Sequence, residues 1–190
     1  YDGDQLLLAV VRSRLRKGPV AGVVGTLMTN LAFEHALAAL GVPFARANVG
    51  DRYVMEMLRE KGWLFGGENS GHILCLDRHT TGDGIVSALQ VLSALREEGG
   101  DLGGLLGGMT LYPQVLINVP LSKGFVWTDN PVIVAAKRDI EARLSGEGRV
   151  LLRASGTEPL LRVMVEGRDE KKVRDAAEAL AAIVREAVGD

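Results

Sequence analysis

The chain has 190 residues, 47% of them hydrophobic, and its 22 Lys and Arg against 24 Asp and Glu give a net charge of −2. This composition is typical of a globular protein of one or two domains. Nucleic acid is not expected as a partner, because proteins that bind it usually present a cationic face. No apolar stretch is long enough for a membrane span, and the single cysteine, Cys75, can form no internal disulfide. We therefore expect a cytoplasmic protein without a membrane partner.

The first half of the chain alternates short apolar runs with helical patterns. Asp2 and Gln5 form a capping-box pattern, so a helix is predicted to begin there. The acidic pair Asp2 and Asp4 is interpreted as capping chemistry rather than as a metal site. The other elements expected in this half are a buried strand in 19–26, a helix in 26–41, a strand in 42–50, a helix in 51–62, short strands around a polar turn in 63–77 and a long helix in 83–100. This alternation predicts an α/β three-layer domain with a mostly parallel sheet.

A different order of elements follows the glycine-rich stretch 99–108, which is predicted to be a flexible connector. The expected elements are a strand in 111–121, a helix in 129–144, strands in 149–153 and 160–167, and a helix in 169–188 whose apolar face consists of Val173, Ala177, Leu180 and Val184. They predict a small α+β domain with an antiparallel sheet. The domains are therefore placed at 1–108 and 109–190, and the connector is expected to let the second domain swing.

The loop RASGTEP, between the last two predicted strands, concentrates groups that bind anions. These groups are two guanidiniums, two hydroxyls and a glycine backbone, supplied by Arg153, Arg162, Ser155, Thr157 and Gly156. Converging donors of these types suit a phosphate. The alternative is a simple hairpin with exposed ion pairs, such as Arg153 with Glu158.

The loop GGENSGH, between two short predicted strands, is a second candidate site. Glycines stand on both sides of Glu68, so its carboxylate is expected to project from a narrow turn. The succession of carboxylate, amide and hydroxyl in Glu68, Asn69 and Ser70 suits sugar hydroxyls or an amine, although polar turns bounded by glycine are common. His72, which follows, is interpreted as a structural histidine.

Arg52, in NVGDRYV, stands near the start of a predicted helix, where the helix dipole disfavours a cation by about 0.3–1 kcal/mol. A bound ligand would explain this position, and a side chain pointing into water would explain it equally. Cys75 and His35 lie in apolar segments and are interpreted as structural. His79 and Asp83 are interpreted as part of a helix entry.

These motifs also stand in an order that is found in one enzyme family. VGTLMTN, VGDRYV, GGENSGH, TTGDGIVSALQVL and LLRASGTEPLLRVMVEG follow one another in the chain. From Tyr1 to the last helix, the chain resembles the C-terminal half of the phosphoglucosamine mutases, in the α-D-phosphohexomutase superfamily. The resemblance implies the third domain of these enzymes, which bears a sugar-recognition loop. It also implies the fourth, a TATA-box-binding-protein-like α+β domain with a phosphate-binding loop that faces the same cleft.

The resemblance implies roles for individual residues. Those expected to contact the sugar are Glu68, Asn69 and Ser70, and Arg52 is expected to make a secondary substrate contact. Those expected to clasp the phosphate that is not being transferred are Arg153, Ser155, Gly156, Thr157 and Arg162. Asn69 and Gly156 favour the glucosamine branch, since the phosphomannomutase/phosphoglucomutase branch often has Met and Asn at these positions. A fragment of the latter branch is the alternative.

The implied reaction is the reversible conversion of glucosamine 6-phosphate to glucosamine 1-phosphate through a phosphoserine, Mg²⁺ and glucosamine 1,6-bisphosphate. In these enzymes the phosphoserine and the aspartate-rich metal loop precede the stretch that YDGDQ resembles. No catalytic or metal-binding residue is therefore expected here, and the chain alone is expected to be inactive. The expected partners are the phosphosugar, the missing N-terminal half and, for the full-length protein, a second copy in a homodimer. The alternative is a stand-alone phosphosugar-binding module.

Overall fold

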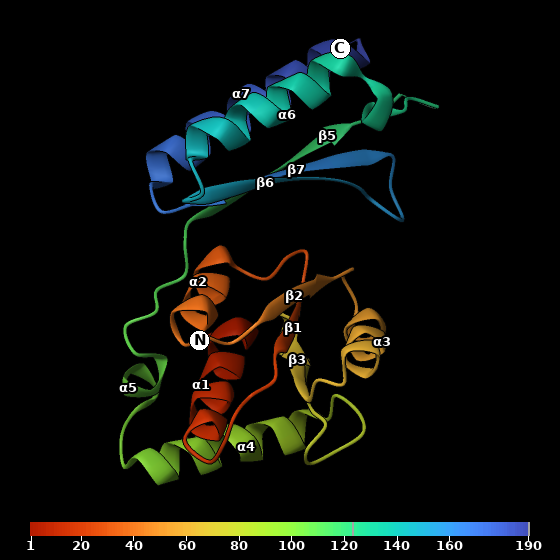
Figure 1. Ribbon diagram of the computed structural model, residues 1–190. Helices are drawn as coiled ribbons and strands as arrows, with labels where there is room; N and C mark the ends of the chain where they lie inside the picture. The colour runs from red at the N-terminus through yellow and green to blue at the C-terminus, as the bar shows by residue number, and fades with distance from the viewer. Residues whose placement is uncertain (123, 190) are drawn as a thin grey trace. The chain divides into compact units, whose positions relative to one another are not determined.

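The computed structural model describes residues 1–122 and 124–189 and divides into two compact units, Tyr1–Leu111 and Tyr112–Asp190 (Figure 1). Each unit has a hydrophobic core of its own. Within the described ranges, no helix combines the length and the apolar composition that crossing a membrane requires.

The first unit is built on a four-stranded sheet in the order β2-β1-β3-β4. The strands are β1 (Val23–Thr26), β2 (Phe44–Ala47), β3 (Phe65–Gly67) and β4 (Ile73–Cys75). β1 pairs in parallel with both β2 and β3, whereas β4 pairs antiparallel with β3. The prediction of a mostly parallel sheet is confirmed.

Helices cover both faces of this sheet and make the three predicted layers. They are α1 (Gly3–Leu15), α2 (Leu31–Ala39), α3 (Asp51–Lys61), α4 (Gly84–Glu98) and α5 (Leu102–Leu106). On one face, α1 and α2 share a buried cluster in which Phe33 packs with Val23 and Phe65. On the other face, Val54 of α3 packs with Val24. The neighbours Val23 and Val24 thus point to opposite sides, as successive residues of a strand must.

The glycine-rich stretch 99–108 differs from the predicted flexible connector because it contains helix α5. Asp101 caps this helix by accepting the Gly104 N–H at 2.8 Å. Leu105 packs in a buried cluster with Ala9 of α1 and Ala94 of α4. A short leucine-containing run between glycines is therefore enough to hold the stretch on the first unit, because burying such a side chain stabilises by about 1.5–3 kcal/mol.

The second unit is a three-stranded antiparallel sheet with two helices on one face (Figure 1). The strands, in the order β5-β7-β6, are β5 (Gln114–Pro120), β6 (Gly148–Ala154) and β7 (Leu160–Gly167). The helices are α6 (Pro131–Leu144) and α7 (Glu170–Val188), and a short 3₁₀ turn, Trp127–Asp129, precedes α6. Asn130 caps α6, and the predicted face of α7 is buried. The predicted α+β architecture is confirmed.

Side chains of this sheet alternate between its two faces. Val119, Val163 and Val165 pack in the core against α6 and α7. The residues between them on each strand therefore lie on the face away from the helices. The strand register aligns these residues in three rows, Gln114–Glu166–Arg149, Leu116–Met164–Leu151 and Asn118–Arg162–Arg153.

The first row contains a fully buried carboxylate. Glu166 is 0% exposed, and it accepts hydrogen bonds from Arg149 Nε and, at 2.9 Å, from Gln114 Nε2. A buried ion of this kind is tolerated only when charged and polar partners offset its loss of hydration.

Replacing Arg149 by methionine should lower the free energy of unfolding by about 2 kcal/mol, because Glu166 loses its cation while staying buried. Adding Glu166→Gln should recover part of that loss, since the remaining buried group is then neutral. Urea denaturation of both variants measures the effect. A double variant less stable than Arg149→Met would contradict the proposed pairing.

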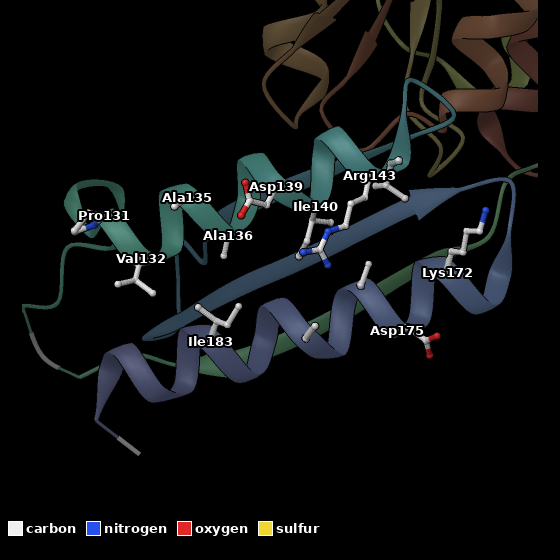
Figure 2. Close-up of a pocket in the computed structure, with 13 residues that line it drawn as sticks. Pro131, Val132, Ala135, Ala136, Asp139, Ile140, Arg143, Lys172, Asp175 and Ile183 are labelled. Atoms are coloured by element: carbon white, nitrogen blue, oxygen red, sulfur yellow. The ribbon is translucent and has the colours of Figure 1, made fainter.

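A groove of about 990 Å³ runs between α6 and α7 on the helix side of the second unit (Figure 2). Alanine and other apolar side chains form most of its lining, and charged groups such as Asp139 and Lys172 also reach it. Because Arg153 and Arg162 lie on the opposite face of the sheet, this groove is separate from the RASGTEP loop.

Candidate functional site

The turn between β6 and β7 contains backbone N–H groups that form no hydrogen bond to the described residues. The Ser155 N–H donates to the Leu160 carbonyl at 2.8 Å, and the Leu160 N–H donates to the Glu158 carbonyl at 2.8 Å. In between, the N–H groups of Gly156, Thr157 and Glu158 donate to no group within residues 1–122 and 124–189. Successive N–H groups at an exposed turn are a favourable place for an anion.

Two guanidinium groups flank the same turn. Arg153 and Arg162 are direct partners in the β6–β7 register and share the face away from the helices. Arg162 Nη2 donates to Ser155 Oγ at 3.4 Å. Among the described residues neither arginine forms an ion pair, so the alternative pairing of Arg153 with Glu158 is not found there. Like charges that face each other across a strand pair are destabilising, on the order of 0.2–1 kcal/mol, and a bound anion would offset this repulsion.

Glu68, at the end of β3, is held by backbone groups. Its Oε1 accepts the Gly50 N–H at 2.9 Å, and its side chain is only 10% exposed. Its Oε2 lies 3.8 Å from His72 Nδ1, while Asn69 and Ser70 form the exposed tip of the turn. The sequence had suggested a carboxylate that projects from the turn, but in the structure it does not project freely. It is oriented by its neighbours.

The bond from Gly50 to Glu68 joins two of the motifs singled out in the sequence, NVGDRYV and GGENSGH. Gly50 has a φ of +129°, a backbone conformation that favours glycine. Arg52, two residues later, instead forms an exposed pair with Glu56 at 2.8 Å, and this pairing raises the pKa of Arg52. In this structure the backbone of the motif, rather than the Arg52 side chain, contacts Glu68.

The N-terminus of α1 supports the same loop. The Gly3 N–H donates to the Asn69 carbonyl at 2.9 Å. A Cβ on Gly3 would lie 2.0 Å from the Glu68 carbonyl oxygen, so no other residue fits here without displacing the loop. Asp2 Oδ1 accepts the Gln5 N–H at 3.0 Å, and Gln5 Oε1 accepts the Asp2 N–H at 3.1 Å, which confirms the capping box.

Asp4 does not cap the helix, and that part of the prediction is wrong. Its Oδ2 accepts the N–H of Asn30, the residue that caps α2, at 2.8 Å. Asp4 is 1% exposed, and its Oδ1 has no hydrogen-bond partner among the described residues. Burial raises the pKa of Asp4 to about 7, although the Asn30 N–H, the Thr29 side chain and the Arg46 charge act to lower it. Asp4 thus ties the start of α1 to the start of α2.

Other residues singled out in the sequence have structural surroundings. Cys75 is buried, and burial raises the pKa of its thiol to about 11. Asp83 caps α4 by accepting the N–H groups of Ile85 and Val86. His35 lies half-buried in α2.

The sequence resemblance implies a magnesium ion, which proteins bind mainly through carboxylate oxygens. In the part of the chain that the structure describes, no three His, Cys, Asp or Glu side chains gather as a metal site. These residues therefore do not fit the ion.

Sequence reasoning missed the residues that support the Glu68 loop. It also missed the third residue of the row that contains Arg162 and Arg153. The supports are Gly3, Asp4 and the Gly50 N–H, and the row member is Asn118. The acidic pair in YDGD was the signal available for Asp4, but its partner lies 26 positions away along the chain. Asn118 gave no local signal, because only the strand register aligns it with Arg162.

Solved structures share this arrangement of an α/β unit followed by an α+β unit. N-acetylphosphoglucosamine mutase of Aspergillus fumigatus, solved in complex with GlcNAc-6P and magnesium, matches with a TM-score of 0.79 and 22% identity. The match covers 97% of this chain and 47% of that protein. This chain thus has the same fold as the part of that protein that it matches.

Family profiles match most of the chain. Residues 2–112 match "Phosphoglucomutase/phosphomannomutase, alpha/beta/alpha domain III", and residues 116–183 match "Phosphoglucomutase/phosphomannomutase, C-terminal domain". The chain therefore belongs to the phosphoglucomutase/phosphomannomutase family. Over 98% of its length it is 73% identical to phosphoglucosamine mutase of Dechloromonas aromatica and 60% identical to that of Thiobacillus denitrificans. It spans about 41% of the length of these relatives.

Proposed function

We propose that this chain supplies sugar binding and distal-phosphate binding to a mutase that interconverts glucosamine 6-phosphate and glucosamine 1-phosphate. The observation that carries the proposal is the facing pair of Arg153 and Arg162 beside the N–H groups of residues 156–158, which donate to none of the described residues. A phosphate dianion satisfies these donors and removes the repulsion between the two cations. Relatives named phosphoglucosamine mutase support the choice of substrate.

In this proposal, the second unit clasps the phosphate that is not being transferred. Arg153 and Arg162 bind its oxygens, and Ser155 and Thr157 add hydroxyl donors. The turn backbone at Gly156 can approach the phosphate closely, because this residue has no Cβ. Nothing in the described residues lies within 4 Å of the position that a Cβ would take. The bisphosphate intermediate binds in two orientations, so the same clasp holds the 6-phosphate in one half-reaction and the 1-phosphate in the other.

The first unit recognises the sugar. Glu68 accepts hydrogen bonds from ring hydroxyls or the amino group, and the Gly50 N–H keeps its carboxylate in one orientation. Asn69 and Ser70 add an amide and a hydroxyl at the exposed tip of the turn. Arg52 remains a proposed secondary contact, and it would have to leave Glu56 to reach a substrate. A preset orientation of this kind lowers the entropy lost on binding.

We place the remaining chemistry in the part of the relatives' length that this chain does not span. There, a phosphoserine transfers its phosphoryl group to the sugar, which yields glucosamine 1,6-bisphosphate and a free serine. After the intermediate turns over, the other phosphoryl group returns to the serine and the product leaves. Mg²⁺ would neutralise charge on the transferred group when bound. Four further expectations stay predictions. They are that the isolated chain is inactive, that the two loops share a cleft, that the protein is cytoplasmic and that the full-length protein forms a homodimer.

Arg153→Ala should weaken binding of glucosamine 6-phosphate at least about tenfold, because it removes a charge-assisted bond to phosphate. Titration calorimetry of the 190-residue chain measures this against a wild-type dissociation constant that we expect near 1 mM, or about −4 kcal/mol. Arg174→Ala is the control, because Arg174 lies on α7, where it forms an exposed pair with Glu170. In a protein that includes the rest of the relatives' length, Arg153→Ala should raise KM by a similar factor.

Each alternative predicts a different result in the same titration. Micromolar affinity of the isolated chain would favour a stand-alone phosphosugar-binding module. Tighter binding of mannose 6-phosphate or glucose 6-phosphate would favour the phosphomannomutase/phosphoglucomutase branch. Equal affinity of wild type and Arg153→Ala would remove the phosphate role of the hairpin.

A further inference from the structure

We infer that Asn118 of β5 is a further phosphate-binding residue, which donates a side-chain N–H to the anion held by Arg162 and Arg153. The inference rests on the proposed phosphate site and extends it from the β6–β7 hairpin to the neighbouring strand. The sequence places Asn118 more than 30 positions before the loop, where no local pattern connects the two.

The strand register places Asn118 beside the guanidinium pair. β5 and β6 flank β7, and Asn118 is the direct partner of Arg162 on one side just as Arg153 is on the other. Val119 is buried in the core against the helices, so its neighbour Asn118 lies on the opposite face, with both arginines. Directly paired side chains have Cβ atoms about 4.5–5.5 Å apart, within reach of one shared phosphate.

The other residues of β5 on this face already have partners or are apolar. Gln114 donates to the buried Glu166, and Leu116 lies in the apolar row with Met164. Asn118 is exposed, and its carboxamide makes no hydrogen bond to the described residues. Asparagine is also depleted in strands, so its place in the middle of β5 is not explained by strand propensity.

A carboxamide suits this position chemically. Two cations already face each other in the row, and a third would add repulsion. A carboxylate would neutralise Arg162 but would repel a phosphate. A carboxamide donates through Nδ2 without adding charge, and its Oδ1 can accept from the Arg162 guanidinium at the same time.

Two substitutions test the inference. Asn118→Ala should weaken binding of inorganic phosphate to the 190-residue chain about fivefold, the loss of one neutral donor. Asn118→Asp should weaken it more than about tenfold, because a carboxylate next to the site repels the anion. The same Asp variant should raise Tm in phosphate-free buffer, since it pairs with Arg162, so weaker binding cannot be attributed to a damaged fold.

The measurement is the rise in Tm with phosphate concentration, at an ionic strength kept constant with chloride. Gln114→Ala is the control, because it removes a side-chain amide from the same strand and face but opposite Glu166 rather than Arg162. This variant should leave phosphate affinity unchanged. Wild-type affinity in both Asn118 variants, combined with weakened binding in Arg153→Ala, would overturn this inference and leave the proposed function standing. Equal affinity in all variants, or no phosphate binding by the wild type, would overturn both.

Discussion

Replacing Gly3 by alanine should destabilise the first unit by about 3 kcal/mol and displace the Glu68 loop. The added Cβ would lie 2.0 Å from the Glu68 carbonyl oxygen, 2.6 Å from the Gly71 nitrogen and 2.9 Å from the Gly71 Cα. All three are backbone atoms, so no side-chain rotation relieves the clash. The loop must move away from α1 and lose the hydrogen bond from the Gly3 N–H to the Asn69 carbonyl.

Gly84→Ala provides a matched control. Gly84 is the first residue of α4, as Gly3 is of α1, and nothing lies within 4 Å of a Cβ built on it. This substitution should be neutral or stabilise by up to about 1 kcal/mol, since alanine is the better helix former. Urea denaturation measures both variants. Equal midpoints for Gly3→Ala and Gly84→Ala would show that α1 does not constrain the loop.

Asp4→Asn should remove a pH dependence of stability that the wild-type chain has between about pH 4 and pH 8. Burial raises the pKa of Asp4 from 3.8 to about 7 in the folded state, so the folded chain binds this proton more tightly than the unfolded chain. The stability that the folded chain gains from this protonated carboxyl group is complete below the pKa of Asp4 in the unfolded chain. It is lost as pH rises through the pKa of Asp4 in the folded chain. A rise of the pKa from 3.8 to about 7 corresponds to at most about 4 kcal/mol of unfolding free energy.

The quantity to measure is the difference in unfolding free energy between Asp4→Asn and wild type, as a function of pH. It should shift in favour of the variant as pH rises, because the amide carries no charge to bury. Asp83→Asn should show the opposite trend, since N–H groups of α4 lower the pKa of Asp83 and its contribution is lost as pH falls. A difference for Asp4→Asn that does not vary with pH would mean that Asp4 is not protonated in the folded chain near neutrality.

The two predictions concern neighbouring residues with one structural role. Gly3 contacts the loop directly, and Asp4 anchors the same helix end to Asn30 of α2. If Glu68 binds the sugar, substitutions at either residue should also raise KM in a protein that includes the rest of the relatives' length. Neither residue needs to touch the substrate for that effect.

Local patterns in the sequence determined which segments became α-helices and strands, with one exception. The capping box at Asp2, the Asn130 cap with Pro131 behind it and the apolar face of α7 are each formed by residues within a few positions of one another. The exception is α5, where glycines suggested a connector. Contacts of Leu105 with Ala9 and Ala94 decided that segment, and no local pattern reports them.

The sequence by itself determined the types of chemical group in the two loops, since RASGTEP and GGENSGH carry their donors and acceptors in consecutive positions. Only the tertiary structure decided how these groups are held. The register of β5, β7 and β6 placed Asn118, Arg162 and Arg153 in one row, and the meeting of α1 and α3 with β3 oriented Glu68. The physical reason is that a side chain's identity is local, whereas its orientation and pKa depend on atoms brought near it by folding from distant parts of the chain.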